Sequence, residues 1–302
     1  MWIALAVAFP WAWFAVRDLG VLAAAVATGL PVPVFVVAAV FLASGARRRR
    51  VSLAAVGASW LVMGLVTVVG PWVPEAGSAP AQPLRLVMAN VRSDNHRPDQ
   101  GVPGVLAHGG DVVVLIEVES RAESAWRDTY PFITPVPGAS KVVLSRYPAR
   151  LVEPVNSTEG FRAARLEIEA PMGRVMLYVV HLARPHARPN LLIGDLNRQH
   201  RAVDDLVRRA EHEDSPVLLI GDFNLSDRTR GYRELHGRYR DAMRSHRAGP
   251  TYVKPILWPE FLRVDYIFTS RQWCSSESHS FVIPGSDHRG IAATVGPCPP
   301  AR

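Results

Sequence analysis

The spacing of hydrophobic positions changes near residue 75. Residues 1–74 carry only six charged side chains, Arg17, Asp18 and the run Arg47 to Arg50, and the stretches between them are apolar or small. Val21–Ala43 and Val51–Val73 contain no charge, and each is long enough to cross a hydrocarbon core of about 30 Å at about 1.5 Å per residue. Both segments are predicted to be transmembrane helices.

Residues 1–16 are also apolar, but their helix of about 24 Å is short for a span. Pro10 is expected to interrupt it. This segment is therefore predicted to be a third span or, alternatively, an interfacial segment. A signal peptide fits poorly, because there is no basic n-region and apolar stretches continue beyond any plausible cleavage point.

The four arginines from Arg47 to Arg50 separate the two predicted spans. Because basic residues are enriched in cytoplasmic loops, this loop is expected inside the cell, with residues 75–302 on the extracytoplasmic side of the cell membrane. A stop-transfer cluster would carry the same arginines without fixing that orientation. Residues 71–83, "PWVPEAGSAPAQP", are typical of a linker. We thus expect a multi-pass membrane anchor at 1–73, a linker at 74–83 and an outer domain at 84–302.

The outer domain shows short apolar runs of strand length, bounded by turn residues. They lie at 84–90, 111–117, 141–145, 164–170, 174–181, 216–221, 264–269 and 291–295. The run "ARLEIEA" (164–170) alternates strictly, as a half-exposed strand does. These runs predict a β-rich core covered by helices.

Two nearly identical segments, "LLIGDLN" at 191–197 and "LLIGDFN" at 218–224, raise the question of a repeat. The first is followed by apolar residues with helical spacing, so it is predicted to begin a helix with a solvated polar face, Asp195 and Asn197 included. The second rises through Val217–Ile220 as a buried strand, and Gly221 permits a close approach at its end. Asp222 and Asn224 then project on the same side. The second segment is the candidate site, and there is no repeat.

Composition and charge add little about partners. Residues 75–302 carry 29 basic and 26 acidic side chains, so the sequence pI near 9.9 does not by itself indicate nucleic acid binding. The two cysteines, Cys274 and Cys298, form one disulfide outside the cytoplasm or remain unpaired thiols, and both alternatives stay open.

Polar residues with useful chemistry end several of the predicted strands. Each has an ordinary structural explanation when taken singly: Glu117 as a solvated strand end, His181 as a hydrogen-bonded core histidine, and Asp265 as half of a salt bridge with Arg263. Their order along the chain gives them more weight together. The full set is Asn90, Glu117, His181, Asp222, Asn224, Asp265, Asp287 and His288.

The pieces "VMANV", "DVVVLIEVES", "VVLSRYP", "VVHL", "PVLLIGDFN", "RVDYIF" and "SDHRG" resemble the endonuclease/exonuclease/phosphatase superfamily. They cover about residues 84–295. "GDFN" followed by "DYIF" and "SDH" at these separations is the specific part of the pattern. The resemblance implies an α/β fold, a four-layer αββα sandwich of the DNase I type preceded here by N-terminal transmembrane helices, and a metal-dependent hydrolase acting on ester bonds. The strand series is compatible with that fold.

The resemblance also implies a role for each residue. Glu117 would hold Mg²⁺, with Mn²⁺ as an alternative, Asn90 beside it would belong to the same metal site, and Asp287 would be a second or water-mediated ligand. Asp222 would activate the attacking water and Asn224 would help to fix the phosphate. Asp265 would orient His288, which would stabilise charge on the phosphate, and His181 would contact phosphate near the leaving group. Arg146 in "SRYP" either reaches the phosphate or has a structural role.

Substrate choice lies in loops that the motifs do not decode. A membrane anchor favours a cell-envelope phospholipid or polyprenyl pyrophosphate, and small membrane-anchored members linked to teicoplanin resistance are similar in layout. An extracellular nuclease acting on DNA or RNA is the alternative, and it predicts an arginine-lined groove and activity that falls steeply with salt. A catalytically silent binding module is a further alternative, which predicts a missing motif residue.

Overall fold

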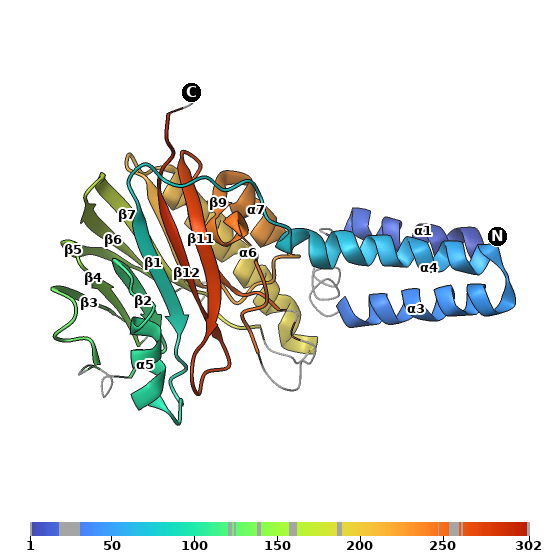
Figure 1. Cartoon of the computed structure of the whole chain (residues 1–302), viewed down its shortest axis with the longest axis horizontal. Coiled ribbons are helices and arrows are strands. Elements are labelled where there is room, and N and C mark those ends of the chain that lie inside the picture. The colour runs from blue at the N-terminus through green and yellow to red at the C-terminus, as the bar shows by residue number, and fades with distance from the viewer. Residues whose placement is uncertain are drawn as a thin grey trace.

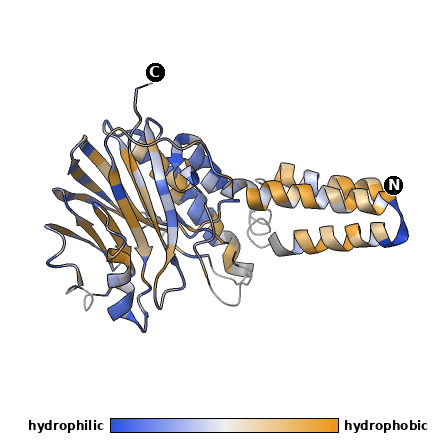
Figure 2. Ribbon diagram, in the orientation of Figure 1, coloured by the Kyte–Doolittle hydropathy of each residue, from blue (hydrophilic) through white to orange (hydrophobic). Residues whose placement is uncertain are grey.

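The protein, studied as a computed structural model, combines a bundle of apolar helices with a β sandwich (Figure 1). The structure describes residues 2–17, 31–119, 123, 125–137, 140–156, 162–185, 189–246, 248–253, 260 and 262–300. Helices α1 (Trp2–Val16), α3 (Pro31–Arg48) and α4 (Val51–Gly64) extend away from the sandwich. Helix α4 continues through the π turn η1 (Leu65–Val69) and the 3-10 turn η2 (Gly70–Trp72). Hydrophobic residues cover these helices, and hydrophilic ones mark the turn between α3 and α4 (Figure 2).

Within the described residues, one helix is long and apolar enough to cross a membrane, Val51–Trp72. It coincides with the predicted segment Val51–Val73. The other predicted span, Val21–Ala43, begins in residues 18–30, which lie outside the described residues, and from Pro31 helix α3 runs past Ala43 to Arg48. A multi-pass anchor therefore stays a prediction.

Helix α1 continues through Pro10, so the predicted interruption is wrong. A proline leaves the carbonyl four residues earlier without its helical hydrogen bond. In this protein that carbonyl, Ala6 O, accepts a hydrogen bond from Trp60 Nε1 at 3.2 Å. Val7 O likewise accepts one from the Ser59 hydroxyl at 2.9 Å. Helix α4 thus supplies donors where the proline removes one, and α1 stays helical.

The outer domain consists of two six-stranded sheets. The first has the order β11 (Trp273–Val282), β12 (Arg289–Pro297), β1 (Leu84–Asn90), β2 (Val112–Ile116), β4 (Lys141–Ser145), β3 (Phe132–Val136). The second has the order β5 (Ala149–Asn156), β6 (Arg162–Ala170), β7 (Gly173–His181), β8 (Val217–Asp222), β10 (Asp265–Ser270), β9 (Tyr239–Asp241). The predicted mixed α/β sandwich is confirmed.

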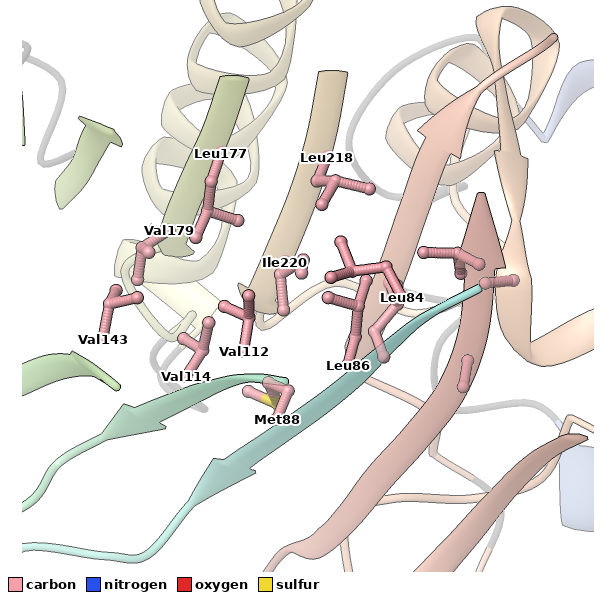
Figure 3. Packing of buried hydrophobic residues seen from close by; sticks show 14 of the residues in the cluster. Leu84, Leu86, Met88, Val112, Val114, Val143, Leu177, Val179, Leu218 and Ile220 are labelled. Atoms are coloured by element: carbon pink, nitrogen blue, oxygen red, sulfur yellow. The ribbon is translucent and has the colours of Figure 1, made fainter. Parts of the chain in front are cut away.

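Three apolar layers hold the sandwich together. Buried side chains of β1, β2, β7 and β8 meet between the sheets, among them Leu86, Val114, Leu177 and Ile220 (Figure 3). Helix α5 (Pro98–Leu106) packs on the outer face of the first sheet. Helices α6 (Pro189–Glu211) and α7 (Arg230–Arg238) pack on the outer face of the second. Each sheet is therefore buried on both faces, which explains the continuous apolar runs of its inner strands.

Two parallel strand pairs determine where polar strand ends gather. Strand β1 pairs in parallel with β2 across α5, and β7 pairs in parallel with β8 across α6. The remaining strand pairs that the structure describes are antiparallel. Parallel neighbours end at the same edge of a sheet. Asn90 at the end of β1 is hydrogen bonded to Asp222 at the end of β8, so the ends of the two pairs meet across the sandwich.

The structure joins Cys274 and Cys298 in a disulfide. Cys274 lies in β11, and Cys298 follows β12, its antiparallel neighbour. This bond closes a loop of 24 residues in sequence and ties an edge strand to the interior of its sheet. A cross-link of this kind restricts the unfolded chain and stabilises the fold.

Candidate active site

The end of strand β8 brings three titratable side chains into neighbouring positions of one sheet. Asp222 is paired with His181 of β7 on one side and with Asp265 of β10 on the other. Gly221 precedes it, and a Cβ atom there would lie 1.8 Å from Val180 O. Only glycine therefore lets β8 approach β7 this closely, as the sequence predicted.

Asp222 is buried and held by amide groups. Asn90 Nδ2 and Asn224 Nδ2 each donate to its Oδ2 at 3.1 Å, and the Asn224 backbone N–H donates to its Oδ1 at 2.9 Å. Burial raises the pKa of Asp222, although His288 and His181 oppose the shift. A fixed carboxylate of raised pKa is a stronger base than an exposed one.

His288 forms a buried pair with Asp265. The two groups join through His288 Nδ1 and Asp265 Oδ2 at 2.9 Å. Burial alone would lower the pKa of His288, but the charges of Asp265 and Asp222 and the hydrogen bond to Asp265 raise it to about 10. His288 Nε2 lies 3.9 Å from Asp222 Oδ2. His288 is thus an imidazolium at neutral pH, pointed toward Asp222.

His181 lies on the other side of Asp222 with the opposite protonation behaviour. Its Nε2 is 3.8 Å from Asp222 Oδ2 and 3.5 Å from Glu117 Oε1. Burial lowers the pKa of His181, and the charge of Lys141 adds to that effect against the carboxylates. The site therefore combines a neutral histidine and a charged one around a single carboxylate.

Glu117 follows strand β2 with its carboxylate partly exposed. Its φ angle is +55°, and that of Asn224 is +48°. Left-handed conformations at non-glycine residues are strained and concentrate at functional sites. Asn90 Nδ2 donates to Glu117 Oε1 at 3.1 Å and the Ser93 backbone N–H donates to its Oε2 at 3.3 Å. These bonds direct the carboxylate beside Asp222.

The polar side chains at the ends of the two parallel strand pairs surround one cleft of about 530 Å³. Six of the predicted residues line it: Glu117, His181, Asp222, Asn224, Asp287 and His288. Asn90 and Asp265 lie buried next to it. The structure therefore brings these eight predicted residues together.

Two groups of side chains offer metal ligands. Ligand atoms of Asp222, Asp265 and His288 lie within 4.8 Å of one another, but a charged His288 bound to Asp265 lacks a free ring nitrogen for a cation. The carboxylates of Glu117 and Asp287 line the cleft and are the hard oxygen donors that fit a divalent ion. Asn90 directs its Nδ2, not its oxygen, at Glu117, because its Oδ1 accepts the Arg92 backbone N–H at 3.1 Å. Its predicted place beside Glu117 is thus that of a hydrogen-bond donor.

Arg146 is not part of this arrangement. Its Nε lies 3.8 Å from Asp111 Oδ1. Asp111 precedes β2, whereas Glu117 follows it, so the two lie at opposite ends of a strand. The phosphate-contacting role considered for Arg146 is wrong. Strand β4 is antiparallel to β2, so the turn "SRYP" that follows β4 lies at the opposite end of these strands from Glu117 and the cleft.

Several residues of the cleft escaped the sequence motifs. Arg92, Arg184 and Tyr252 line it, with the Arg184 guanidinium 5.5 Å from the centre of the Tyr252 ring. Arg92 and Arg184 each follow a motif residue within three positions, which was an available signal. Tyr252 pairs with His288 through an isolated bridge, and its flanking loop has no motif that would reveal this.

Gln199 was also missed, and the prediction of a solvated polar face on helix α6 is wrong at this point. Gln199 is 4% exposed, as is Asp195. Gln199 Nε2 donates to Ala183 O and to Asn224 O, each at 2.9 Å. It thus fastens the loops that follow His181 and Asp222 to one helix.

Comparisons with known proteins agree with this architecture. Residues 58–288 match the model described as "Endonuclease/Exonuclease/phosphatase family". A solved endonuclease/exonuclease/phosphatase from Beutenbergia cavernae is similar, with 21% identity, coverage of 72% of each chain and a TM-score of 0.55. Humanized D. rerio TDP2 is similar at 16% identity over 71% of this chain and 99% of its own, with a TM-score of 0.55. The human Nocturnin catalytic domain, with bound sulfate, matches at 16% identity over 72% and 94%, with a TM-score of 0.55. No curated protein is significantly similar to the chain.

Proposed function

This chain belongs to the endonuclease/exonuclease/phosphatase family, and we propose that within it the protein is a membrane-anchored, Mg²⁺-dependent phosphoesterase of a cell-envelope lipid. Family membership makes the chain a metal-dependent hydrolase acting on ester bonds. The finer proposal is that it hydrolyses a phosphate ester or a pyrophosphate whose lipid part stays in the bilayer. The observation that carries the hydrolytic part is the register that places Asp222 between His181 and Asp265.

Each residue has a task that its surroundings support. Asp222 takes a proton from the attacking water, since its pKa is raised and two asparagines fix its oxygens. His288, held as an imidazolium by Asp265, stabilises negative charge that grows on the phosphate. His181, kept neutral by burial, contacts the phosphate near the leaving group. A divalent ion held by Glu117 and Asp287 would neutralise the non-bridging oxygens.

Membrane attachment is supported by the apolar helix Val51–Trp72, which precedes the first strand of the catalytic domain, β1, by eleven residues. Trp72 Nε1 donates to Asp227 Oδ2 at 2.8 Å, so the end of this helix is fastened five residues after Asp222. The disulfide between Cys274 and Cys298 suits an oxidising compartment. Together with the arginines at 47–50, it supports an extracytoplasmic catalytic domain.

An extracellular nuclease is the second candidate, and one observation favours it. Two arginines, Arg92 and Arg184, line the cleft, as a groove for a phosphodiester backbone would require. Arg92, however, is paired with Asp94, so the carboxylate of Asp94 offsets the charge of one of the two arginines. A silent binding module is not favoured, since the eight motif residues are in place.

The proposal is tested by measuring hydrolysis by the purified full chain, with Mg²⁺ or with chelator. The substrates are a phospholipid, a polyprenyl pyrophosphate, DNA and an inositol phosphate. We expect metal-dependent turnover of a lipid substrate. Turnover of DNA that falls steeply with salt would favour the nuclease instead. Absence of metal-dependent turnover on all four substrates would contradict the proposal.

A further inference from the structure

Two histidines lie side by side on the outer face of the first sheet, apart from the catalytic cleft. His108 follows helix α5, and His279 belongs to the edge strand β11. His108 Nδ1 and His279 Nε2 are 3.5 Å apart, and the ring centres are 5.6 Å apart. Both side chains are half-buried, and neither lines the cleft around Asp222. The proposed hydrolysis gives this pair no task.

A backbone carbonyl determines which ring nitrogen of His279 is free. His279 Nδ1 lies 3.3 Å from Glu277 O. Because a carbonyl oxygen only accepts hydrogen bonds, Nδ1 carries the proton, and the neutral ring presents the lone pair of Nε2 to His108. Histidines that bind metal ions are commonly held in this way, with the other ring nitrogen donating to a carbonyl or a carboxylate. His279 is thus oriented as a metal ligand.

The ring of His108 is fixed by an aromatic neighbour. It stacks on Phe281 with the ring centres 3.7 Å apart and the planes at 20° to one another. Burial lowers the pKa of His108, and the charges of His279 and Arg85 add to that effect, so the ring is neutral at neutral pH. A neutral imidazole with its proton on Nε2 presents the lone pair of Nδ1. His108 then offers a second ligand atom beside that of His279.

The distance between the two nitrogens fits one ion bound by both. Zinc–nitrogen bonds are about 2.0–2.1 Å long, so two nitrogens 3.5 Å apart would subtend an angle of about 115–120° at the ion, close to the tetrahedral arrangement of zinc. Imidazole nitrogen suits zinc, copper and nickel, whereas magnesium prefers oxygen ligands. The pair therefore selects a different class of ion from the carboxylates of Glu117 and Asp287.

One basic and one acidic side chain accompany the pair. Arg85 of β1 is in register with Thr294 of β12, and the hydroxyl of Thr294 donates to Glu277 Oε2 at 3.2 Å. Glu277 has a φ angle of +51°, at an irregularity of β11 between Ser276 and His279. Backbone strain of this kind concentrates at functional sites. A cation at the pair would thus have an exposed carboxylate two residues from one of its ligands, opposite in charge to Arg85.

From this geometry we propose that His108 and His279 together bind one divalent ion of the zinc class, with solvent completing its coordination. The ion fastens the segment after α5 to β11, an edge strand of the first sheet. The loop that joins β11 to β12 carries Asp287 and His288, so the ion also steadies a strand that leads into the catalytic cleft. This site needs neither a membrane nor a substrate and does not depend on the proposed function.

The test is zinc binding by the full chain, purified in detergent without a polyhistidine tag and freed of metal with a chelator. Titration calorimetry in excess Mg²⁺ counts the bound zinc. We expect the wild type to bind one equivalent more than His108→Gln or His279→Gln. His212→Gln is the matched control, because His212 Nδ1 also lies beside a carbonyl, Arg208 O at 2.6 Å. This variant should bind as much zinc as the wild type.

Thermal unfolding in the Glu117→Gln background, which removes a carboxylate of the cleft, gives a second readout. Excess zinc should raise the Tm there, because the ion binds the folded chain. Adding His108→Gln or His279→Gln should abolish the rise. If the loss of the ring stacked on Phe281 keeps His108→Gln from folding, His279→Gln decides the result.

Three results would overturn the proposal. The first is equal zinc stoichiometry in the wild type and the two variants of the pair. The second is an equal loss of zinc in His212→Gln. The third is displacement of the counted equivalent by Mg²⁺, which would indicate an oxygen site instead of an imidazole site.

Discussion

The segments "LLIGDLN" at 191–197 and "LLIGDFN" at 218–224 differ at one position, yet one lies in helix α6 and the other ends strand β8. Asp195 pairs with Arg198 one helical turn along. Asp222 instead faces His181 and is held by Asn90. Both carboxylates are buried, so burial alone does not distinguish them. They differ in their neighbours. Strand β7 places His181 beside Asp222 in register, and strand β10 places Asp265 on its other side.

The neighbouring sequence determines which structure each copy adopts. After the first copy, Val203, Leu206 and Val207 fall on one face of a helix and pack on the second sheet. The second copy follows Pro216, and its residues up to Asp222 belong to β8, which is buried throughout between β7 and β10. The short shared sequence therefore does not determine whether its aspartate belongs to the site. The position of that aspartate in the sheet does.

The largest difference between the two copies should be in catalysis. Asp222→Asn removes the base and is expected to lower kcat by about a thousandfold. Asp195→Asn, the same change in the helical copy, should keep kcat within about threefold of the wild type. Both are measured as metal-dependent hydrolysis by the full chain. Equal losses in the two variants would show that the aspartate of β8 has no special role.

The two glycines should differ next, in stability. A Cβ atom at Gly221 would lie 1.8 Å from Val180 O, whereas at Gly194 the nearest atom is Arg198 Nη1 at 3.6 Å. Gly221→Ala is expected to lower the free energy of unfolding by about 3 kcal/mol or more. Gly194→Ala should raise it by up to about 1 kcal/mol, because alanine favours helix. Denaturant titration of both variants checks this, and similar values would contradict the packing at β8.

Only the second copy lies beside a histidine that is charged in the folded state. The pKa of His288 is raised to about 10, above the unfolded value of about 6.5. Its stabilising contribution is therefore complete below about pH 6.5 and is lost as the pH rises toward 10. We expect the free energy of unfolding to fall by up to about 1.4 kcal/mol for each pH unit in that window.

Denaturant titration of wild type and His288→Asn across this window measures the effect. The variant should lose most of the slope, and His212→Asn, just after helix α6, is the control that should keep it. An unchanged slope in His288→Asn would mean that Asp265 and Asp222 do not hold a charged imidazole there.

The smallest effect is expected from a hydrogen bond that joins the helix of the first copy to the second copy. Gln199, two residues after the first copy, donates to Asn224 O in the second and to Ala183 O. Gln199→Leu should lower kcat about tenfold with little change in KM, since it loosens loops that position the reacting groups. Asn197→Ala on the same helix is the control. If KM alone changed, Gln199 would have a role in binding and not in positioning.

The inner strands of both sheets were predictable from the sequence, and the edge strands were not. The eight predicted strands are the inner strands of the two sheets, and β3, β5, β9 and β11, which were missed, are the edges. Inner strands are buried on both faces and read as apolar runs. Edge strands are short, polar or carry proline, as in "FITPV" and "WCSSESHSFV", because they must resist further pairing.

The candidate site followed the same rule. Residues that end inner strands, such as Asn90, Glu117 and Asp222, were found because strand ends are visible in sequence. Gln199 was not, because its role depends on how helix α6 is rotated against two loops. Arg146 was misplaced because sequence order does not reveal at which end of the strands a turn lies. The continuation of helix α1 through Pro10 was missed because Trp60, which donates to Ala6 O, lies on another helix.

The most direct test of the account is a Mg²⁺ titration of phospholipid hydrolysis by the full chain, comparing wild type with Glu117→Gln. The account predicts no turnover in chelator, saturation with Mg²⁺ for the wild type, and an apparent metal affinity weakened about tenfold or more in the variant, because Glu117 directs a carboxylate oxygen into the cleft. Hydrolysis that persists in chelator, or the same Mg²⁺ dependence in both proteins, would contradict it.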